Sequence, residues 1–332
     1  MIRYWVIHRA DYLTLLQNAA QDAGVQIKLT SRVASVSSDP PTLTLEDGTS
    51  LTADLIIGAD GIRSGIRASI LGDQDVLPIP SPNCAYRALV PREKMMTHPT
   101  TAALMTSPAA NCWIGPGRHI MAYPIRNGSQ YNIVMSHPGR AKVGVWNQAG
   151  DIAEMNKTYE DFDPVIRQAL GYVESALKWT LADVGALPRW RSRNGRVVLV
   201  GDAAHAMLPY LSQGAAQAVE DAAVLAECLD RAGHADDLGV VMEVYESIRK
   251  ERAERIQDGA RANGVVWHFD DGDEQERRDR AMGGTLREGE VNPNLWADSK
   301  FRPWLMGYDA IRDANERLDD VLKEKRVGQS RL

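Results

Sequence analysis

A continuous apolar run, Val197 to Val200, ends at Gly201 and is followed directly by Asp202. Apolar residues without alternation are typical of a strand that is buried on both faces of a parallel sheet. Such a strand delivers Asp202 at its carboxyl end, which is where open α/β sheets place their ligands. The segment therefore predicts a parallel sheet with a ligand site at the end of this strand.

A helix is expected to begin near Gly214, because apolar residues recur with helical spacing from Ala215 to Leu229. Small residues between Asp202 and this helix leave room for a flat ligand close to the backbone. The first amides of the helix, at Gly214 and Ala215, have no intrahelical partner and carry partial positive charge. A carboxylate for a sugar hydroxyl beside a helix N-terminus suits a flavin nucleotide.

The segment from Gly195 to Asp221 resembles the second FAD-binding motif of the group A flavoprotein aromatic hydroxylases, the family of salicylate and p-hydroxybenzoate hydroxylases. This resemblance implies that Asp202 holds the ribitol and ribose region of FAD. It also implies that the amides of Gly214 and Ala215 face the pyrimidine edge of the isoalloxazine. The alternative interpretation is an ordinary buried strand and helix with a polar cap.

Two further segments are similar to motifs of the same family. His8-Arg9-Ala10-Asp11 resembles its H-R segment, which implies that Arg9 reaches the FAD. Asp11 is also a common type of helix-start residue, so a structural cap is the alternative for it. The segment from Leu55 to Ser64 is similar to the D-G motif, which implies that Asp60 serves the flavin pyrophosphate and the nicotinamide nucleotide.

The runs around Arg87 and Tyr123 resemble the substrate-binding sheet of the family. The resemblance implies an FAD-dependent monooxygenase that consumes NAD(P)H and dioxygen and hydroxylates a phenolic or related aromatic molecule through a flavin C4a-hydroperoxide. Arg87 is expected to favour the substrate phenolate, because a fixed cation lowers the pKa of a neighbouring phenol. Tyr123 is expected to hydrogen-bond the substrate oxygen or to take part in a proton relay. A structural role is the alternative for both residues. His119 and His205 are not expected to act in catalysis, and a structural hydrogen bond is expected for His205.

The family's G-x-G-x-x-G fingerprint is absent from the sequence. In the family it lies on a first βαβ unit that precedes the H-R segment, and that unit needs about 30 residues. Because Met1 lies seven residues before His8, we expect a partial FAD-binding lobe that binds FAD more weakly than a complete family member. The sequence leaves open a fragment of a working hydroxylase, a short paralogue with isomerase or cyclase activity, and a non-catalytic partner of a full-length homologue.

The expected fold is an α/β, p-hydroxybenzoate hydroxylase-like two-domain fold that lacks the first βαβ unit. A length of 332 residues also suggests two domains. Residues 1–72 and 189–263 are expected to form the partial FAD-binding lobe, and residues 73–188 a mostly antiparallel substrate sheet. Residues 264–332 are expected to form C-terminal helices. Loss of the first unit should expose apolar edges, which are suited to a homo-oligomer or to association with a homologue.

Composition excludes several other classes of protein. A net charge of −6 argues against nucleic-acid binding, and no apolar run approaches the roughly 20 residues that cross a membrane. Three cysteines without C-x-x-C and scattered histidines predict no metal site and a reducing, cytoplasmic location. The tail Ser330-Arg331-Leu332 is one conservative change from the S-K-L peroxisomal address, which makes the peroxisome the alternative location.

Overall fold

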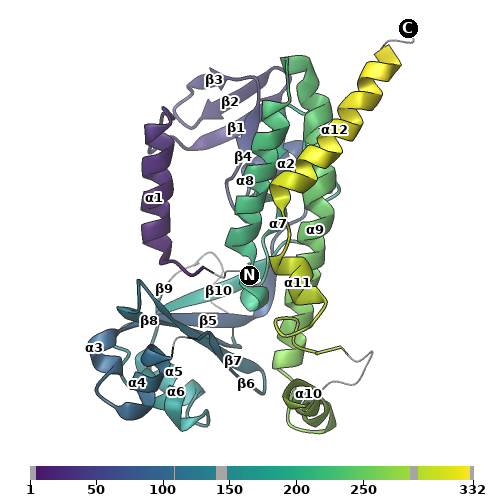
Figure 1. The fold of residues 1–332 in the computed structure, drawn as a ribbon. Coiled ribbons are helices and arrows are strands. Elements are labelled where there is room, and N and C mark those ends of the chain that lie inside the picture. The colour runs from purple at the N-terminus through teal and green to yellow at the C-terminus, as the bar shows by residue number, and fades with distance from the viewer. Residues whose placement is uncertain (1–4, 108, 140–147, 285–290, 330–332) are drawn as a thin grey trace. The chain divides into compact units, whose positions relative to one another are not determined.

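A computed structural model describes residues 5–107, 109–139, 148–284 and 291–329 (Figure 1). The chain divides into two compact units, each assembled from three separate segments. Unit one comprises residues 1–28, 80–181 and 264–294, and unit two comprises residues 29–79, 182–263 and 295–332. The two units are therefore interleaved along the sequence, and each is described by itself.

Unit two contains the parallel strands that the sequence predicts. Strand β11 (Val197–Leu199) pairs in parallel with β4 (Ile56–Gly58), and all three residues of β11 are buried. Gly58 is required where β4 meets helix α2 (Gly65–Leu71), because a Cβ at this position would lie 2.8 Å from Cγ2 of Ile66. This close approach sets the strand directly against the helix that follows it.

A separate antiparallel sheet lies in the same unit. Its strands, in the order β1 (Val33–Ser38), β2 (Pro41–Leu45) and β3 (Ser50–Thr52), pair as neighbours along the chain. The turn between β2 and β3 contains Gly48 with a φ of +85°, a value that glycine adopts without strain. The Asp47-Gly48 pair is a common signal for a type I′ hairpin turn, and a hairpin does form here. Of the two residues only Gly48 has a positive φ, so the turn itself is not of type I′.

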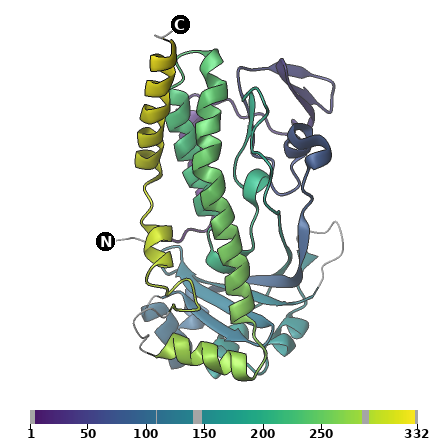
Figure 2. The same cartoon turned by 90° about the vertical axis from the view of Figure 1, so that its right-hand side faces the viewer.

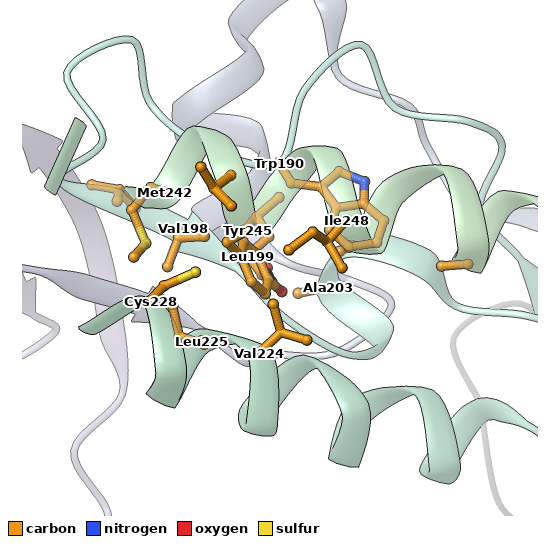
Figure 3. Close-up of a cluster of buried hydrophobic side chains, with 14 of the residues drawn as sticks. Trp190, Val198, Leu199, Ala203, Val224, Leu225, Cys228, Met242, Tyr245 and Ile248 are labelled. Carbon is orange, nitrogen blue, oxygen red and sulfur yellow. Dashed lines mark hydrogen bonds between the residues drawn. The ribbon is translucent and has the colours of Figure 1, made fainter. Parts of the chain in front are cut away.

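Three long helices of unit two lie side by side, as Figure 2 shows for α8 (Gly214–Asp230), α9 (Leu238–Trp267) and α12 (Ala310–Gln329). Their apolar residues meet β11 in a buried cluster that includes Trp190, Tyr245 and Leu199 (Figure 3). The Tyr245 hydroxyl donates a hydrogen bond of 3.0 Å to the carbonyl of Leu199. The shorter helical segments of this unit are η1 (Gly72–Gln74), α7 (Asp202–His205), η2 (Pro209–Leu211), η3 (Ala235–Asp237) and α11 (Phe301–Met306).

Unit one is built on a six-stranded sheet in the order β6-β7-β8-β5-β10-β9. Each pair with a described register is antiparallel, as the sequence predicts. The strands are β5 (Ile79–Pro91), β6 (Asn111–Gly115), β7 (Arg118–Ile125), β8 (Gln130–Pro138), β9 (Gln148–Ala149) and β10 (Leu177–Asp183).

The two faces of this sheet differ in chemistry. Alternate residues such as Tyr86 and Ile133 are buried in an apolar cluster with the short helices on one side of the sheet (Figure 1). Because successive side chains of a strand point to opposite faces, Arg87 and Asn132 belong to the other face. The helices are α3 (Arg92–Met95), α4 (Pro99–Thr106), α5 (Ile152–Thr158) and α6 (Pro164–Leu170).

The division into units differs from the expected boundaries at both ends of the chain. Helix α1 (Arg9–Asp22) belongs to unit one, although residues 1–72 were expected in the FAD-binding lobe. The reason is a two-point ion pair, in which the Arg126 guanidinium in the β7–β8 turn donates 2.7 Å and 2.6 Å hydrogen bonds to Asp11. The C-terminal region is also divided, since α10 (Asp273–Gly283) belongs to unit one and α11 and α12 to unit two.

Several apolar side chains are exposed to solvent, although the sequence pattern of their strand or helix predicts that they are buried. Ile57 in β4 is 44% exposed and Val219 in α8 is 49% exposed. The buried side of α8 instead carries Gln217, Asp221 and Val224, so its stripe of small apolar residues faces away from the core. Among the described residues, no helix is both long and apolar enough to span a bilayer.

Candidate functional site

Asp202 begins α7 immediately after Gly201, whose φ of +58° turns the chain sharply at the end of β11. The Asp202 side chain is exposed, and it makes no hydrogen bond or ion pair within the described part of the chain. A Cβ built on Gly214 would lie 4.0 Å from Oδ1 of Asp202. The carboxylate is therefore unpaired and close to the start of α8.

The N-terminus of α8 carries no side-chain cap. Its N-cap residue, Gln213, makes no capping hydrogen bond, so the first amides at Gly214 and Ala215 keep their free N–H groups. An unpaired carboxylate beside uncapped helix amides fits FAD. Asp202 can accept from a ribityl or ribose hydroxyl, and the amides can face an anionic edge of the ring system.

Asp60 has a different environment from Asp202. Its carboxylate accepts a 2.5 Å hydrogen bond from the Ser64 hydroxyl and a 3.1 Å hydrogen bond from the amide of Ile66. Ser64 in turn caps α2 by accepting from the amide of Arg67. Asp60 therefore organises the turn that leads into α2, and its assignment to the pyrophosphate and nicotinamide nucleotide stays a prediction.

Arg67 was missed by the sequence analysis, although it links two of the predicted cofactor motifs. Its side chain is 1% exposed and forms an ion pair of 2.9 Å with Asp75. Its Nη1 donates to the carbonyl of Ile62, at 3.0 Å, and to that of Ala203, at 3.2 Å. An arginine in a short helix gives no signal of this role, because the carbonyl of Ala203 that links it to the second motif lies 136 residues away in the sequence.

A buried ionic cluster contacts the backbone of the Gly201–Asp202 turn. Asp221 Oδ2 accepts from the amide of Gly201 at 2.8 Å and lies 2.6 Å from Nε2 of His205. Its other oxygen accepts from Nε of Arg249 at 2.8 Å. These contacts with cationic and N–H groups outweigh the effect of burial and lower the pKa of Asp221. The structural role expected of His205 is thus confirmed.

Arg9 and Arg87, predicted to contact cofactor and substrate, line the same pocket of unit one. The pocket has a volume of about 490 Å³ and no acidic residue in its wall. Trp179 and the strand residues Ala88 and Leu89 supply apolar surface. A pocket with two arginines, an aromatic wall and no carboxylate is suited to a flat anionic molecule.

Arg87 is half-buried and forms no ion pair within the described part of the chain. Its Nε donates a 3.3 Å hydrogen bond to Oδ1 of Asn132, which is 1% exposed. Asn132 lies directly opposite Tyr123 in the β7–β8 register, so the three side chains share one face of the sheet. Burial raises the pKa of Tyr123 above its usual value of 10, and the charge of Arg87 only partly opposes this shift.

His119 lies on the same sheet face and has a structural partner. Its Nδ1 lies 2.7 Å from Nε2 of His268, and its ring meets Trp267 edge-on. Burial, assisted by the neighbouring histidine, lowers the pKa of His119 to about 3, and burial lowers that of His268 to about 4. Both rings are therefore neutral at neutral pH, and each has the other as a partner within unit one.

Comparison with known proteins identifies the family. The family model described as "FAD binding domain" matches residues 3–260. The FAD-dependent monooxygenase OpS4 of Beauveria bassiana (strain ARSEF 2860) is 35% identical over 314 residues, which cover 94% of this chain and 73% of that protein. The 3-hydroxybenzoate 6-hydroxylase 2 of Aquipseudomonas alcaligenes is 33% identical over 264 residues, which cover 79% of this chain and 78% of that protein.

The solved structures agree with the sequence comparison. A structure described as a salicylate hydroxylase substrate complex superposes with a TM-score of 0.75 at 28% identity, covering 93% of this chain and 75% of that one. The parallel β11–β4 pair, the antiparallel sheet and the Asp202 turn are thus parts of a known fold. The chain belongs to the FAD-binding domain family, within the group A flavoprotein aromatic hydroxylases, and is an FAD-dependent monooxygenase by class.

Proposed function

We propose that this protein hydroxylates a phenolic or related aromatic molecule, with NAD(P)H as reductant and dioxygen as oxidant. The observation that carries the proposal is the half-buried Arg87 without an acidic partner in a pocket that contains no carboxylate. A cation in such a place favours an anionic ligand, because burial weakens solvent screening of its charge. A phenolate is the form of a phenol that is most reactive towards an electrophilic oxygen.

FAD, when bound, supplies electron transfer from the reductant and transfer of one oxygen atom to the ring. Asp202, the first amides of α8 and Arg9 are the groups that would hold it. Neither Asp202 nor Arg9 makes an ion pair in the described residues, so both charges are available to a ligand. These residues orient the cofactor, while Arg87 and its neighbours bind the substrate.

Tyr123 acts in this proposal as a hydrogen-bond donor. Since burial raises the pKa of Tyr123 above 10, its hydroxyl is protonated at neutral pH and can donate to the substrate oxygen. Arg87 and Tyr123 would then stabilise the same developing negative charge from two strands.

Isotopically labelled dioxygen tests the proposal directly. Purified protein is supplied with FAD, NADH or NADPH and a panel of simple phenols, including salicylate and 3-hydroxybenzoate. We expect one labelled hydroxyl in the product and reductant consumption that depends on the phenol. An unlabelled product isomeric with the substrate, formed without consumption of reductant, would favour the isomerase or cyclase alternative.

The cellular location of the protein and its association with other chains are also proposals. The tail Ser330-Arg331-Leu332 lies outside the described residues, so the cytoplasm and the peroxisomal alternative both stay predictions. The exposed Ile57 and Val219 supply apolar surface for a second copy or a full-length homologue. Sedimentation of the purified chain, alone and mixed with such a homologue, tests association separately from hydroxylation.

A further inference from the structure

Asn132 occupies a central place on the polar face of the unit-one sheet. It lies on β8, between Tyr123 on β7 and Leu89 on β5, and is directly opposite each of them in register. Only 1% of its surface is exposed, which is unusual for an asparagine unless its polar atoms are used. Its Oδ1 accepts the 3.3 Å hydrogen bond from Nε of Arg87.

This hydrogen bond fixes one side of the Arg87 guanidinium. Because the group is planar, holding it at Nε determines the plane in which both terminal NH₂ groups lie. Those two groups have no protein acceptor in the part of the chain that the structure describes. They therefore remain available as a two-pronged donor for an anionic oxygen of a ligand.

The choice of an amide at this position matters for the charge of the pocket. A carboxylate on β8 at the same point would accept the same hydrogen bond but would neutralise Arg87. The neutral carbonyl of Asn132 orients the guanidinium and leaves its positive charge for the ligand. Together with the acid-free wall of the pocket, this arrangement preserves an uncompensated cation.

We propose that Asn132 is a positioning residue of the substrate site, which orients the Arg87 fork towards a substrate phenolate or carboxylate without neutralising it. The proposal rests on the proposed function of Arg87 in anion binding. It adds a requirement that the function alone does not make, namely that the residue beside Arg87 accepts a hydrogen bond and carries no charge.

The test uses 4-nitrophenol as a probe, because the absorbance of its phenolate reports the ionisation of the bound molecule. The full chain supplied with FAD is titrated with the probe across neutral pH, and the bound pKa is compared with the free one. We expect binding to lower the pKa of the probe in the wild type. Asn132→Asp should abolish this shift, because the new carboxylate neutralises Arg87. Phenolate binding should weaken about tenfold or more, the effect of losing one charge-assisted hydrogen bond between Arg87 and the phenolate.

Two further variants separate the possible causes. Asn132→Leu keeps the size and neutrality of the side chain but removes the acceptor, so it should weaken binding while the shift is only reduced. Asn156→Asp makes the same chemical change at an exposed position of α5 and should leave both quantities at wild-type values. Thermal unfolding of each variant shows whether a loss of binding is a loss of fold, and Asn132→Ser replaces any variant that does not fold.

The outcomes distinguish this proposal from the function on which it rests. One outcome would overturn only the positioning role. In that outcome the wild type shifts the pKa of the probe, Arg87→Leu removes the shift, and every folded Asn132 variant retains it. The anion site at Arg87 would then stand without a role for Asn132. If the wild type itself produces no shift, the anion site at Arg87 and the role of Asn132 are both overturned. In the hydroxylation assay, a loss confined to KM for aromatic anions supports orientation of the fork, whereas an equal loss for a neutral aromatic contradicts it.

Discussion

Arg249 in unit two and Arg87 in unit one are both withdrawn from solvent, but their guanidinium groups have opposite surroundings. Arg249 is fully buried and donates to Asp221, Glu220 and Gln217, at 2.8, 2.6 and 2.6 Å. Arg87 is half-buried, and its one acceptor within the described part of the chain is the neutral amide of Asn132. The first charge is matched within the protein, whereas the second is left for a ligand.

The residues beyond the direct hydrogen-bond partners of each arginine also differ in charge. The unit-two cluster combines carboxylates, arginines and a histidine that compensate one another beneath the Asp202 turn. The polar sheet face of unit one surrounds Arg87 with groups that are neutral at neutral pH, among them Tyr123 and His119. The matched charges support a backbone turn, whereas the unmatched charge is available to a ligand. The following predictions test this contrast.

The largest effect is expected from Arg249→Leu. This change leaves the buried Asp221 without its arginine partner and removes one of the two arginines that bind Glu220. Breaking a buried pair from one side typically costs about 3–5 kcal/mol. Urea denaturation should show a loss of this size in the free energy of unfolding. Arg312→Leu breaks an exposed pair with Glu316 and serves as control. A loss for Arg249→Leu no larger than for the control would show that the cluster is not a stabilising unit.

The paired histidines of unit one should make stability depend on pH. The pKa is about 3 for His119 and about 4 for His268 in the folded protein, against an ordinary value of 6.5. The unfolded chain therefore takes up protons below about pH 6.5 that the folded protein does not take up until about pH 4, so the free energy of unfolding should fall as the pH falls through this window. Urea titrations at several pH values should give a flatter dependence for His119→Gln. An unchanged slope, matching that of the exposed His98→Gln, would contradict the assignment.

Asp202→Ala tests the cofactor side of the contrast. The unpaired carboxylate is expected to contact FAD, and loss of a charge-assisted hydrogen bond costs about 1.5–3 kcal/mol, or roughly ten- to a hundredfold in affinity. Quenching of flavin fluorescence gives the ratio of the dissociation constants. Asp230→Ala, at the exposed C-terminal end of α8, is the matched control. Equal affinities for wild type and Asp202→Ala would remove this residue from the cofactor site.

Arg87→Lys should retain positive charge but lose the planar two-pronged donor. We expect reductant oxidation to continue while a larger share of dioxygen is released as hydrogen peroxide, because the ring is poorly activated. The ratio of hydroxylated product to peroxide measures this coupling. Arg92→Lys changes an exposed arginine just beyond the end of the same strand and should couple like the wild type. If Arg87→Lys also couples like the wild type, Arg87 is a structural residue.

Local patterns predicted much of the fold. The unbroken apolar run of β11 and the Asp47-Gly48 pair are signals carried by neighbouring residues, and the structure forms the parallel strand and the hairpin. The helix at Gly214 also begins where its spacing predicts. These signals depend on backbone geometry and burial, which short stretches of sequence encode directly.

The supporting contacts could not be predicted in the same way. Asp221 and Arg249 lie on different helices, and Arg67 donates to a carbonyl 136 residues away. Asn132 alternates with apolar residues like any polar strand residue, so its link to Arg87 appears only once β5 and β8 are in register. Such partners are set by packing between distant segments, for which one sequence contains no local signal.

The smallest effect is expected from Arg126→Ala, which removes the exposed two-point ion pair with Asp11. Exposed pairs contribute little to stability because water and salt screen them, so the free energy of unfolding should stay within the error of the wild-type value. Helix α1 has no buried residue, and its exposed Leu13, Leu15 and Leu16 should become better substrates for thermolysin once this tie is lost. Arg118→Ala breaks a similar two-point contact with Asp161 and should leave cleavage of α1 unchanged. If Arg126→Ala is cleaved in α1 no faster than this control, the ion pair does not hold α1 to unit one. If it instead destabilises the protein as much as Arg249→Leu, the distinction between screened and buried charge fails.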